Sequence, residues 1–175
     1  MALQTSLKLV PTARYLQVQL TICNNSKQYE LFDQMYCTWE DNWRCDRSGI
    51  GLAPHSCTKN NLQTIILPPG ESFSHKPHWL LLRQIKPGRS TIRFGLVRRR
   101  TNYTSEEIER VYLEQVRLRA DYVRKEREQN PRFDMPDKTY YFYAFRINHN
   151  GYTGQEDVFW SNAVTADIRK EWIRR

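Results

Sequence analysis

The sequence lacks the long apolar runs and the glycine- and proline-rich segments that mark several large protein classes. No stretch approaches the ~20 apolar residues of a membrane-spanning helix, and the mean hydropathy is −0.75. Seven glycines and eight prolines are too few for a collagen-like or linker-like chain. With 39% hydrophobic and 13% aromatic residues, the 175 residues can bury the core of one domain.

Motifs for nucleophilic catalysis and nucleotide binding are also missing. The sequence has no Gly-x-Ser-x-Gly, no phosphate-binding loop and no dinucleotide fingerprint. His75 and His78 lack the helical spacing and the glutamate of a zinc protease, so we expect a solvated loop there. We therefore expect a protein without catalytic activity or a bound cofactor. A hydrolase of the cell envelope is a further alternative, for which no catalytic residue can be named.

The four cysteines lie close together in the first third of the chain. Cys23, Cys37, Cys45 and Cys57 form an even, clustered set, which favours two disulfides and an oxidising compartment and leaves three pairings open. Zinc bound by Cys37, Cys45, His55 and Cys57 is an alternative, but no Cys-x-x-Cys pair supports it. No basic segment followed by an apolar one opens the chain, so we expect an exported, mature form with its signal peptide removed, or else a cytosolic protein.

Alternating apolar and polar residues predict several short strands. The clearest example is Leu16–Ile22, in which every even residue is apolar. Tyr29–Met35 is expected to pair back onto it. Further strands are predicted at Leu62–Leu67, Trp79–Ile85, Thr91–Val97, Tyr140–Ile147 and Val158–Ile168. Many short strands with Pro-Gly turns and no alternation with helices predict an all-β antiparallel sandwich.

One segment changes to helical periodicity. Thr104 and Glu107 form a capping box, and apolar residues then recur at steps of three and four to Val123. We predict a helix from about Ser105 to Glu128, inserted at about 103–130 within a single domain spanning residues 1–175. Its apolar stripe favours packing on the sandwich, and projection as a docking element is the alternative.

The order of several short motifs is similar to that of a known protein class. The motifs are Asn24-Asn25-Ser26 after a strand, Cys37-Thr38-Trp39, Asn42-Trp43, Cys57-Thr58-Lys59-Asn60, Leu67 to Ser72, Arg93 to Leu96 and Trp160 to Val164. Over roughly residues 15–97 and 140–168 the chain resembles small exported bacterial immunoglobulin-like β-sandwich domains. The resemblance implies the fold and export, and Cys37 and Cys57 match its pattern best. Some such domains are periplasmic immunity proteins or inhibitors that neutralise a toxin or enzyme.

Two groups of residues are candidates for binding a partner protein. On the helix, Tyr112, Arg119, Tyr122 and Arg124 are of the types that dominate interface hot spots. A second candidate surface combines Tyr152 with the loop around Trp43, which lies among polar residues and is expected to be exposed. Trp39 and Trp160 are expected in the core.

Charge adds the final expectation. The 27 basic and 19 acidic residues give a net charge of +8, which favours an acidic partner. We therefore expect a periplasmic or secreted immunity or inhibitor protein that occludes the active site of an acidic toxin or envelope enzyme. The alternative is a binder of nucleic acid or another anionic polymer through Arg98-Arg99-Arg100, Arg83, Arg93 and the basic C-terminal residues.

Overall fold

Antiparallel strands and one long helix make up the fold, as the sequence predicts. The computed structural model describes residues 3–35, 37–57, 62–133, 141–143 and 152–173. In chain order the elements are β1 (Leu3–Pro11), β2 (Leu16–Asn24), β3 (Glu30–Met35), η1 (Trp39–Asn42), β4 (Trp43–Cys45), β5 (Ile50–Leu52), β6 (Leu62–Leu67), β7 (Ser72–Ser74), β8 (His78–Leu82), β9 (Gly88–Ile92), β10 (Phe94–Thr101), α1 (Ser105–Gln129), β11 (Tyr141–Tyr143), β12 (Tyr152–Trp160), β13 (Val164–Ile168) and η3 (Lys170–Trp172). The expected all-β architecture with a helical insertion between two late strands is confirmed.

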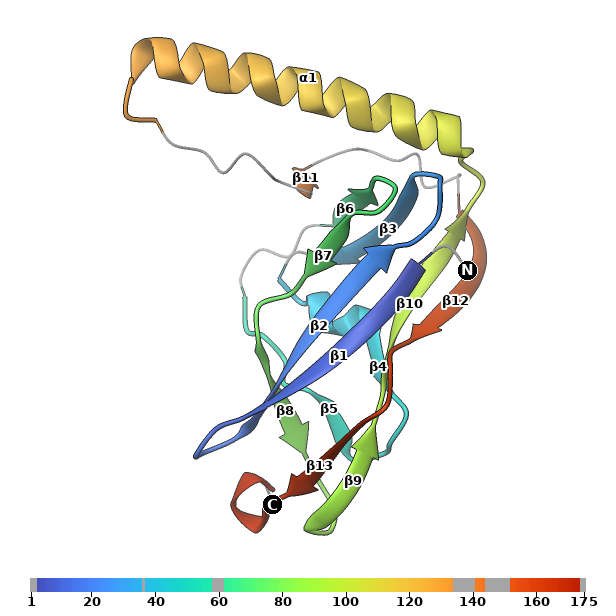
Figure 1. Cartoon of the computed structure of the whole chain (residues 1–175), viewed down its shortest axis with the longest axis vertical. Coiled ribbons are helices and arrows are strands. Elements are labelled where there is room, and N and C mark those ends of the chain that lie inside the picture. The colour runs from blue at the N-terminus through green and yellow to red at the C-terminus, as the bar shows by residue number, and fades with distance from the viewer. Residues whose placement is uncertain (1–2, 36, 58–61, 134–140, 144–151, 174–175) are drawn as a thin grey trace.

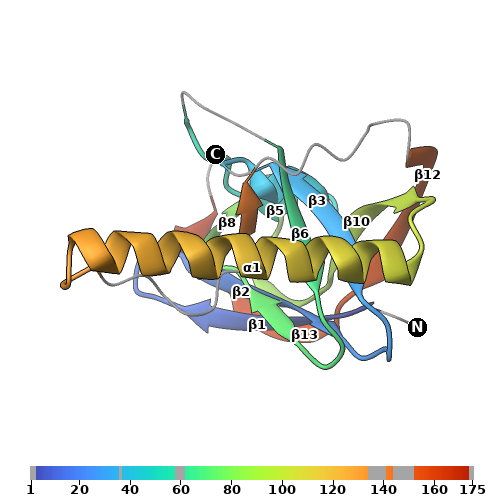
Figure 2. The same ribbon diagram turned by 90° about the horizontal axis from the view of Figure 1, so that it is seen from above.

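The strands form two layers around a shared core. One layer is the sheet β1-β2-β8-β5, in which β7 also pairs with β2. The other contains the sheets β12-β10-β4 and β11-β6-β3, and the pair β13-β9 continues the β10–β12 ribbon. Figures 1 and 2 show β1 and β2 on one side of the molecule and β3, β6 and β10 on the other.

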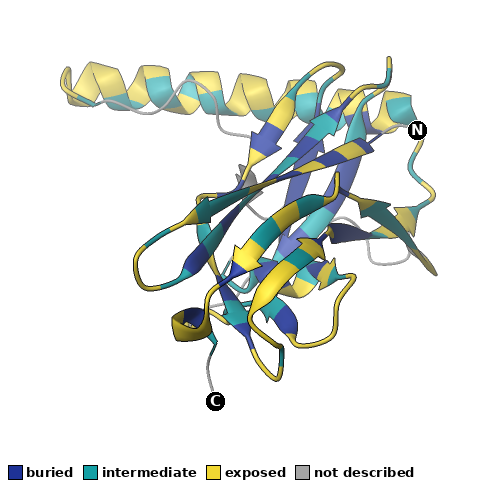
Figure 3. Ribbon diagram, turned by 60° about the horizontal axis from the view of Figure 1, so that its bottom comes forward, coloured by how far each residue is buried: buried dark blue, intermediate teal, exposed yellow. Residues whose placement is uncertain are grey.

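The side chains of β2, which has neighbours on both sides in its sheet, alternate strictly between buried and outward-facing. Leu16, Val18, Leu20 and Ile22 are essentially inaccessible, whereas the residues between them face outward. The same alternation in β1 is visible as bands in Figure 3. Burial of each of these side chains stabilises the fold by roughly 2 kcal/mol. A shift of one residue would expose the whole row, so the register of β2 is strongly specified.

Several predicted strands differ from the observed ones in partner or length. β3 pairs with β6 rather than with β2, and β1 was not predicted from the sequence. The predicted strand Thr91–Val97 is divided at Arg93, whose backbone N–H donates to Asp46 Oδ1 at 2.9 Å instead of to a neighbouring strand. The predicted strand Val158–Ile168 is divided after Trp160, where the Ser161 hydroxyl accepts a hydrogen bond from the backbone N–H of Phe94.

Two more predictions are settled only in part. The predicted strand Trp79–Ile85 corresponds to β8, which ends at Leu82 and does not continue to Ile85. Gln84, just beyond it, has a positive φ of 53°. Within the predicted strand Tyr140–Ile147 the structure describes only β11. Gly70, by contrast, has a φ of 76°, which suits the third position of a type II turn and fits the Pro-Gly turns expected from the sequence.

The predicted helix is confirmed with its N-terminal cap. α1 runs from Ser105 to Gln129, and Thr104 and Glu107 make the reciprocal hydrogen bonds of a capping box. In the described part of the chain, no helix is long and apolar enough to span a membrane.

A buried asparagine joins the two layers at the end of β2. The Asn24 side chain is fully inaccessible, and its Nδ2 donates to the carbonyl oxygens of Gln28 at 2.7 Å and of Leu67 at 2.8 Å. Its Oδ1 accepts hydrogen bonds from the N–H and the hydroxyl of Ser26. One side chain therefore connects the end of β2 with the end of β6 and with the loop that leads into β3.

Replacing this side chain tests its importance for stability. We expect Asn24→Ala to lower the free energy of unfolding by about 2–4 kcal/mol, because it leaves buried carbonyl groups without a donor. Chemical denaturation measures the change. Asn25→Ala is the matched control, because Asn25 is exposed and should lose less than about 1 kcal/mol. Equal losses for the two variants would contradict this role for Asn24.

Candidate functional site

The first turns of α1 are anchored to the sandwich. Ile108 is buried and packs with Leu31 of β3 and Ile66 of β6 in a small apolar cluster of their own. The Ser105 hydroxyl accepts a hydrogen bond from the backbone N–H of Tyr29 at 3.1 Å. These contacts fix the direction in which the helix leaves the sandwich.

Tyr112 belongs to this anchor. Its ring lies 5.4 Å from the ring of Tyr29, centroid to centroid, and both rings pack on the Ile108 cluster. Burial raises the pKa of Tyr112, and the neighbouring Tyr29 and Glu71 raise it further. Tyr112 is half-buried beside the sandwich, where it helps to hold the helix in place, and its contact with a partner stays a prediction.

Beyond Tyr112 the helix extends past the sandwich with apolar side chains in solvent. Leu113, Val116, Leu118 and Tyr122 are 43–53% exposed, and they are four of the seven most exposed large apolar side chains in the described residues. Figure 1 shows α1 crossing above the strands and continuing past them, and α1 is mostly exposed in Figure 3. The predicted packing of the apolar stripe is therefore correct for the first two turns, in which Ile108, Val111 and Tyr112 pack on the sandwich.

The other helix candidates lie on this projecting half. The ring of Tyr122 meets that of Phe133 edge to face at a centroid distance of 6.1 Å. Arg124 is paired with Asp121 at 3.0 Å, and both side chains are largely exposed. Arg119 is half-buried. We call Leu113, Val116, Leu118, Arg119, Tyr122 and Arg124 the helix surface.

In the second predicted surface, the expected exposure of Trp43 is wrong. Trp43 is 7% exposed, because it faces inward from β4 in register with the buried Leu96. Tyr152 lies at the start of β12, opposite Thr101 of β10. Trp160, expected in the core, is exposed and lies beneath the guanidinium of Arg93 at 5.7 Å from the ring centroid. Both tryptophan predictions were wrong, since the strand pairing decides which face each ring occupies.

Three histidines gather around Trp39, which packs against the core as expected. His75 stacks on the Trp39 ring at a centroid distance of 3.8 Å, and His78 meets Trp39 edge to face at 5.3 Å. His55 stacks on His78 at 4.3 Å. The expected solvated loop is wrong for His75, which is 5% exposed and whose Nε2 has no hydrogen-bond partner among the described residues. Burial, together with the nearby His78, lowers the pKa of His75 to about 3.

A glutamate orients the outermost histidine of this cluster. Glu40 is buried at the start of η1, and its two carboxylate oxygens accept hydrogen bonds from the backbone N–H of His55 at 2.6 Å and from His55 Nδ1 at 3.1 Å. A Glu–His pair of this kind can act as a general base toward water or a substrate hydroxyl. The ring of His55 contacts Trp39 and His78.

One disulfide closes the loop that carries Trp39 and His55 of this cluster. Cys37 and Cys57 are bonded, whereas Cys23 and Cys45 are free thiols. The expected second disulfide is therefore absent from the described residues, since Cys23 lies on the outer face of β2 and Cys45 on β4 in the other layer. Burial raises the pKa of the Cys45 thiol, and Asp46 raises it further. No group of three or more potential metal ligands is present in the described part of the chain.

Carboxylates neutralise much of the arginine-rich strand. Arg98 is paired with Glu30 and Asp157, and Arg100 is paired with Asp157 at 2.7 Å. The hydrogen bond from Arg100 lowers the pKa of Asp157, and the charge of Arg100 lowers it further. Arg93 is paired with Asp46 at 3.0 Å. These pairs weaken the case for a nucleic-acid surface, because phosphate binding needs cations that are not already neutralised.

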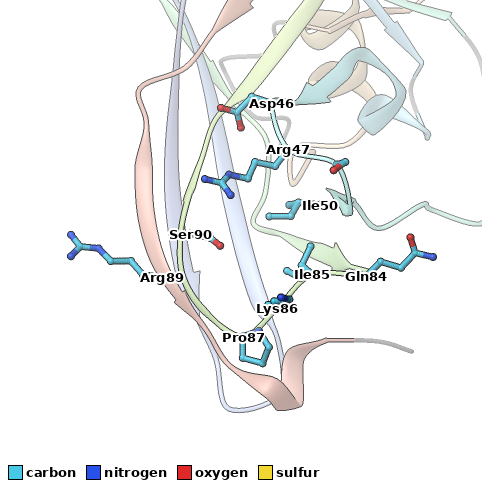
Figure 4. Close-up of a pocket in the computed structure, with 10 residues that line it drawn as sticks. Asp46, Arg47, Ile50, Gln84, Ile85, Lys86, Pro87, Arg89 and Ser90 are labelled. Carbon is cyan, nitrogen blue, oxygen red and sulfur yellow. The ribbon is translucent and has the colours of Figure 1, made fainter.

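A polar pocket of about 610 Å³ lies at the end of the molecule opposite α1. Arg47, Lys86 and Arg89 contribute positive charge to its wall. Figure 4 shows Arg89 pointing outward, away from Lys86, while Arg47 Nε donates to the carbonyl of Thr91 at 2.9 Å. The three cations therefore do not converge on one point as an anion site requires.

No protein family, no characterised protein and no solved structure matches this chain.

Removal of the disulfide tests its contribution to the stability of the fold. We expect Cys37→Ser/Cys57→Ser to lower the free energy of unfolding by about 3 kcal/mol, because the bond closes a loop with a sequence separation of 20. Denaturation with and without reductant measures this change. Cys23→Ser, in which a hydroxyl can replace the thiol that donates to Asn25, is the control and should keep the full sensitivity to reductant. A double variant that still responds to reductant would contradict the assigned pairing.

The buried His75 predicts a loss of stability in weak acid. The folded-state pKa of His75, about 3, lies below the unfolded value of 6.5, so the unfolded chain takes up a proton that the folded chain refuses. This contribution is complete above about pH 6.5 and is lost as the pH falls toward 3, with about 2 kcal/mol lost by pH 5. Denaturation at several pH values should show this extra loss in the wild type but not in His75→Phe, which retains an aromatic ring against Trp39. His55→Gln should lose stability in weak acid as the wild type does. If the stability of His75→Phe fell with pH in parallel with that of the wild type, the assignment of this loss to His75 would be refuted.

Proposed function

We propose that this chain is a non-catalytic protein-binding module, an exported inhibitor or immunity protein of immunoglobulin-like type, whose projecting helix docks into its partner. The observation that carries the proposal is the helix surface, where apolar side chains stand in solvent on a rigidly anchored helix. These side chains lie around most of the circumference of α1, because residues of a helix are turned by about 100° from one to the next and Leu113 and Tyr122 therefore point in nearly opposite directions. Large apolar residues exposed on one projecting element typically mark an interaction site. A helix that is enclosed by a groove of its partner is a common mode of protein recognition.

The chemistry of the helix surface favours a partner with an apolar cleft and an acidic rim. Leu113, Leu118 and Tyr122 would supply buried apolar area, while Arg119 and Arg124 would meet carboxylates at the rim. The net charge of +8 would speed encounter with an acidic protein. An enzyme or toxin would be inhibited sterically, because the helix would occupy the cleft that its substrate uses.

The Cys37–Cys57 disulfide supports the proposed compartment. Disulfides persist in the periplasm and outside the cell and are rare in the cytosol. We therefore place the protein in the periplasm or the external medium as part of the same proposal.

A variant with charges on the helix tests the proposed function. The immobilised wild type and Leu113→Glu/Leu118→Glu are each exposed to the periplasmic and secreted proteins of the host. Retained proteins are identified by mass spectrometry, and the affinity of the main one is measured. We expect at least ~100-fold weaker binding by the double variant, because two carboxylates would enter an apolar interface.

The control and the functional assay make the result specific. Leu62→Glu changes an equally exposed leucine outside the helix, 45% exposed, and should bind like the wild type. The wild type should block the enzymatic or toxic activity of the partner at equimolar ratio, and affinity should fall with added salt. Equal binding by the helix variant, or a partner whose activity is unaffected, would refute the proposal.

A further inference from the structure

The outer face of the sheet β1-β2-β8-β5 is open and almost free of charge. Because side chains alternate along these strands, the outward set is known: Gln4, Ser6, Lys8 and Val10 on β1, Gln17, Gln19, Thr21 and Cys23 on β2, Ser72 and Ser74 on β7, and Trp79 and Leu81 on β8. Lys8 is the one charged residue in this set, although 26% of the whole chain is charged. Amide and hydroxyl groups therefore dominate this face, and in Figure 1 no other element covers β1 or β2.

An aromatic pair lies at one end of this face. The rings of Tyr15 and Trp79 are 4.9 Å apart, centroid to centroid, and inclined by 38°. Trp79 is 45% exposed, and the strand register places Gln17 directly opposite it. The exposed ring of Trp79 can therefore stack against a ligand while the side-chain amide of Gln17 forms a hydrogen bond to the same ligand.

We propose that this face binds a neutral polysaccharide chain. The negative face of an aromatic ring attracts the polarised C–H groups of a pyranose. Amides and hydroxyls can both donate to and accept from sugar hydroxyls, as Gln17 and Gln19 on β2 would do. The near absence of charge favours an uncharged polymer, because a charged one would find no counter-ions along β2, β7 and β8.

The strand register places the outward polar side chains and the Tyr15–Trp79 pair on one uninterrupted stretch of the sheet. Outward residues of one strand repeat at about 6.8 Å, and neighbouring strands lie about 4.8 Å apart. Ser6, Thr21 and Ser74 form one row across three strands, in which the hydroxyls of Thr21 and Ser74 are 2.8 Å apart. A chain of several sugar units that stacks on Trp79 can therefore follow β2 toward this row.

The polysaccharide face is separate from the helix surface. Figure 1 shows β8 and the β1–β2 hairpin at the far end of the molecule from α1. The two proposals can therefore fail independently, since changes at Trp79 leave the helix intact.

Two equally exposed tryptophans allow a matched test. Trp79 and Trp160 are 45% and 44% exposed, but Trp160 lies on β12 in the other layer. Wild type, Trp79→Ala, Tyr15→Ala and Trp160→Ala are run through native gels that contain soluble neutral β-glucans, a mannan or chito-oligosaccharides, with anionic polygalacturonate as comparison. Circular dichroism and thermal melting identify any variant that fails to fold, and Gln17→Ala then replaces it.

The expected result is specific to one tryptophan and to neutral polymers. At least one neutral polysaccharide should retard the wild type and Trp160→Ala, with affinity insensitive to salt. Trp79→Ala and Tyr15→Ala should bind about tenfold more weakly, the effect of losing one stacking contact. The proposal is overturned if no neutral polysaccharide retards the wild type, if Trp160→Ala loses as much affinity as Trp79→Ala, or if only the anionic polymer binds.

Discussion

The hydrogen bonds of buried Asn24 hold together the parts of the fold on which the helix rests. Asn24 ends β2, the central strand of one layer, and binds the carbonyl of Leu67 at the end of β6 in the other. It also binds the carbonyl of Gln28, which directly precedes Tyr29. Since Tyr29 contacts both Ser105 and Tyr112 of α1, one buried amide connects the register of β2 to the position of the helix.

The same connection explains why the long helix leaves the sandwich in a fixed direction. Ile108 and Tyr112 anchor only the first turns, and the capping box stabilises the N-terminus. The later turns depend on helical propensity and on pairs such as Asp121–Arg124 rather than on packing. A helix built in this way keeps its apolar side chains in solvent at a cost in stability, which is understandable if those side chains serve binding.

Charge is unevenly divided between the two layers. Arginines with carboxylate partners gather on β10 and around β12, as in the pairs of Arg98 and Arg100 with Asp157. The outer face of β1, β2, β7 and β8 has one charged residue, Lys8. The net positive charge therefore describes only part of the surface, and the two layers offer partners of different chemistry.

Local patterns in the sequence were sufficient for the elements whose stability is local. The alternation in Leu16–Ile22 predicted β2, and Thr104 with Glu107 predicted the start of α1, because strand periodicity and helix capping involve residues close in sequence. The partner of β3, the burial of Trp43 and His75 and the exposure of Trp160 could not be predicted in this way. Each depends on a residue far along the chain, such as Leu96 opposite Trp43 or Trp39 against His75. The sequence by itself determined that short strands predominate, the position of β2 and the start of α1, whereas only the tertiary structure decided which faces are buried, because burial depends on which distant strands pair.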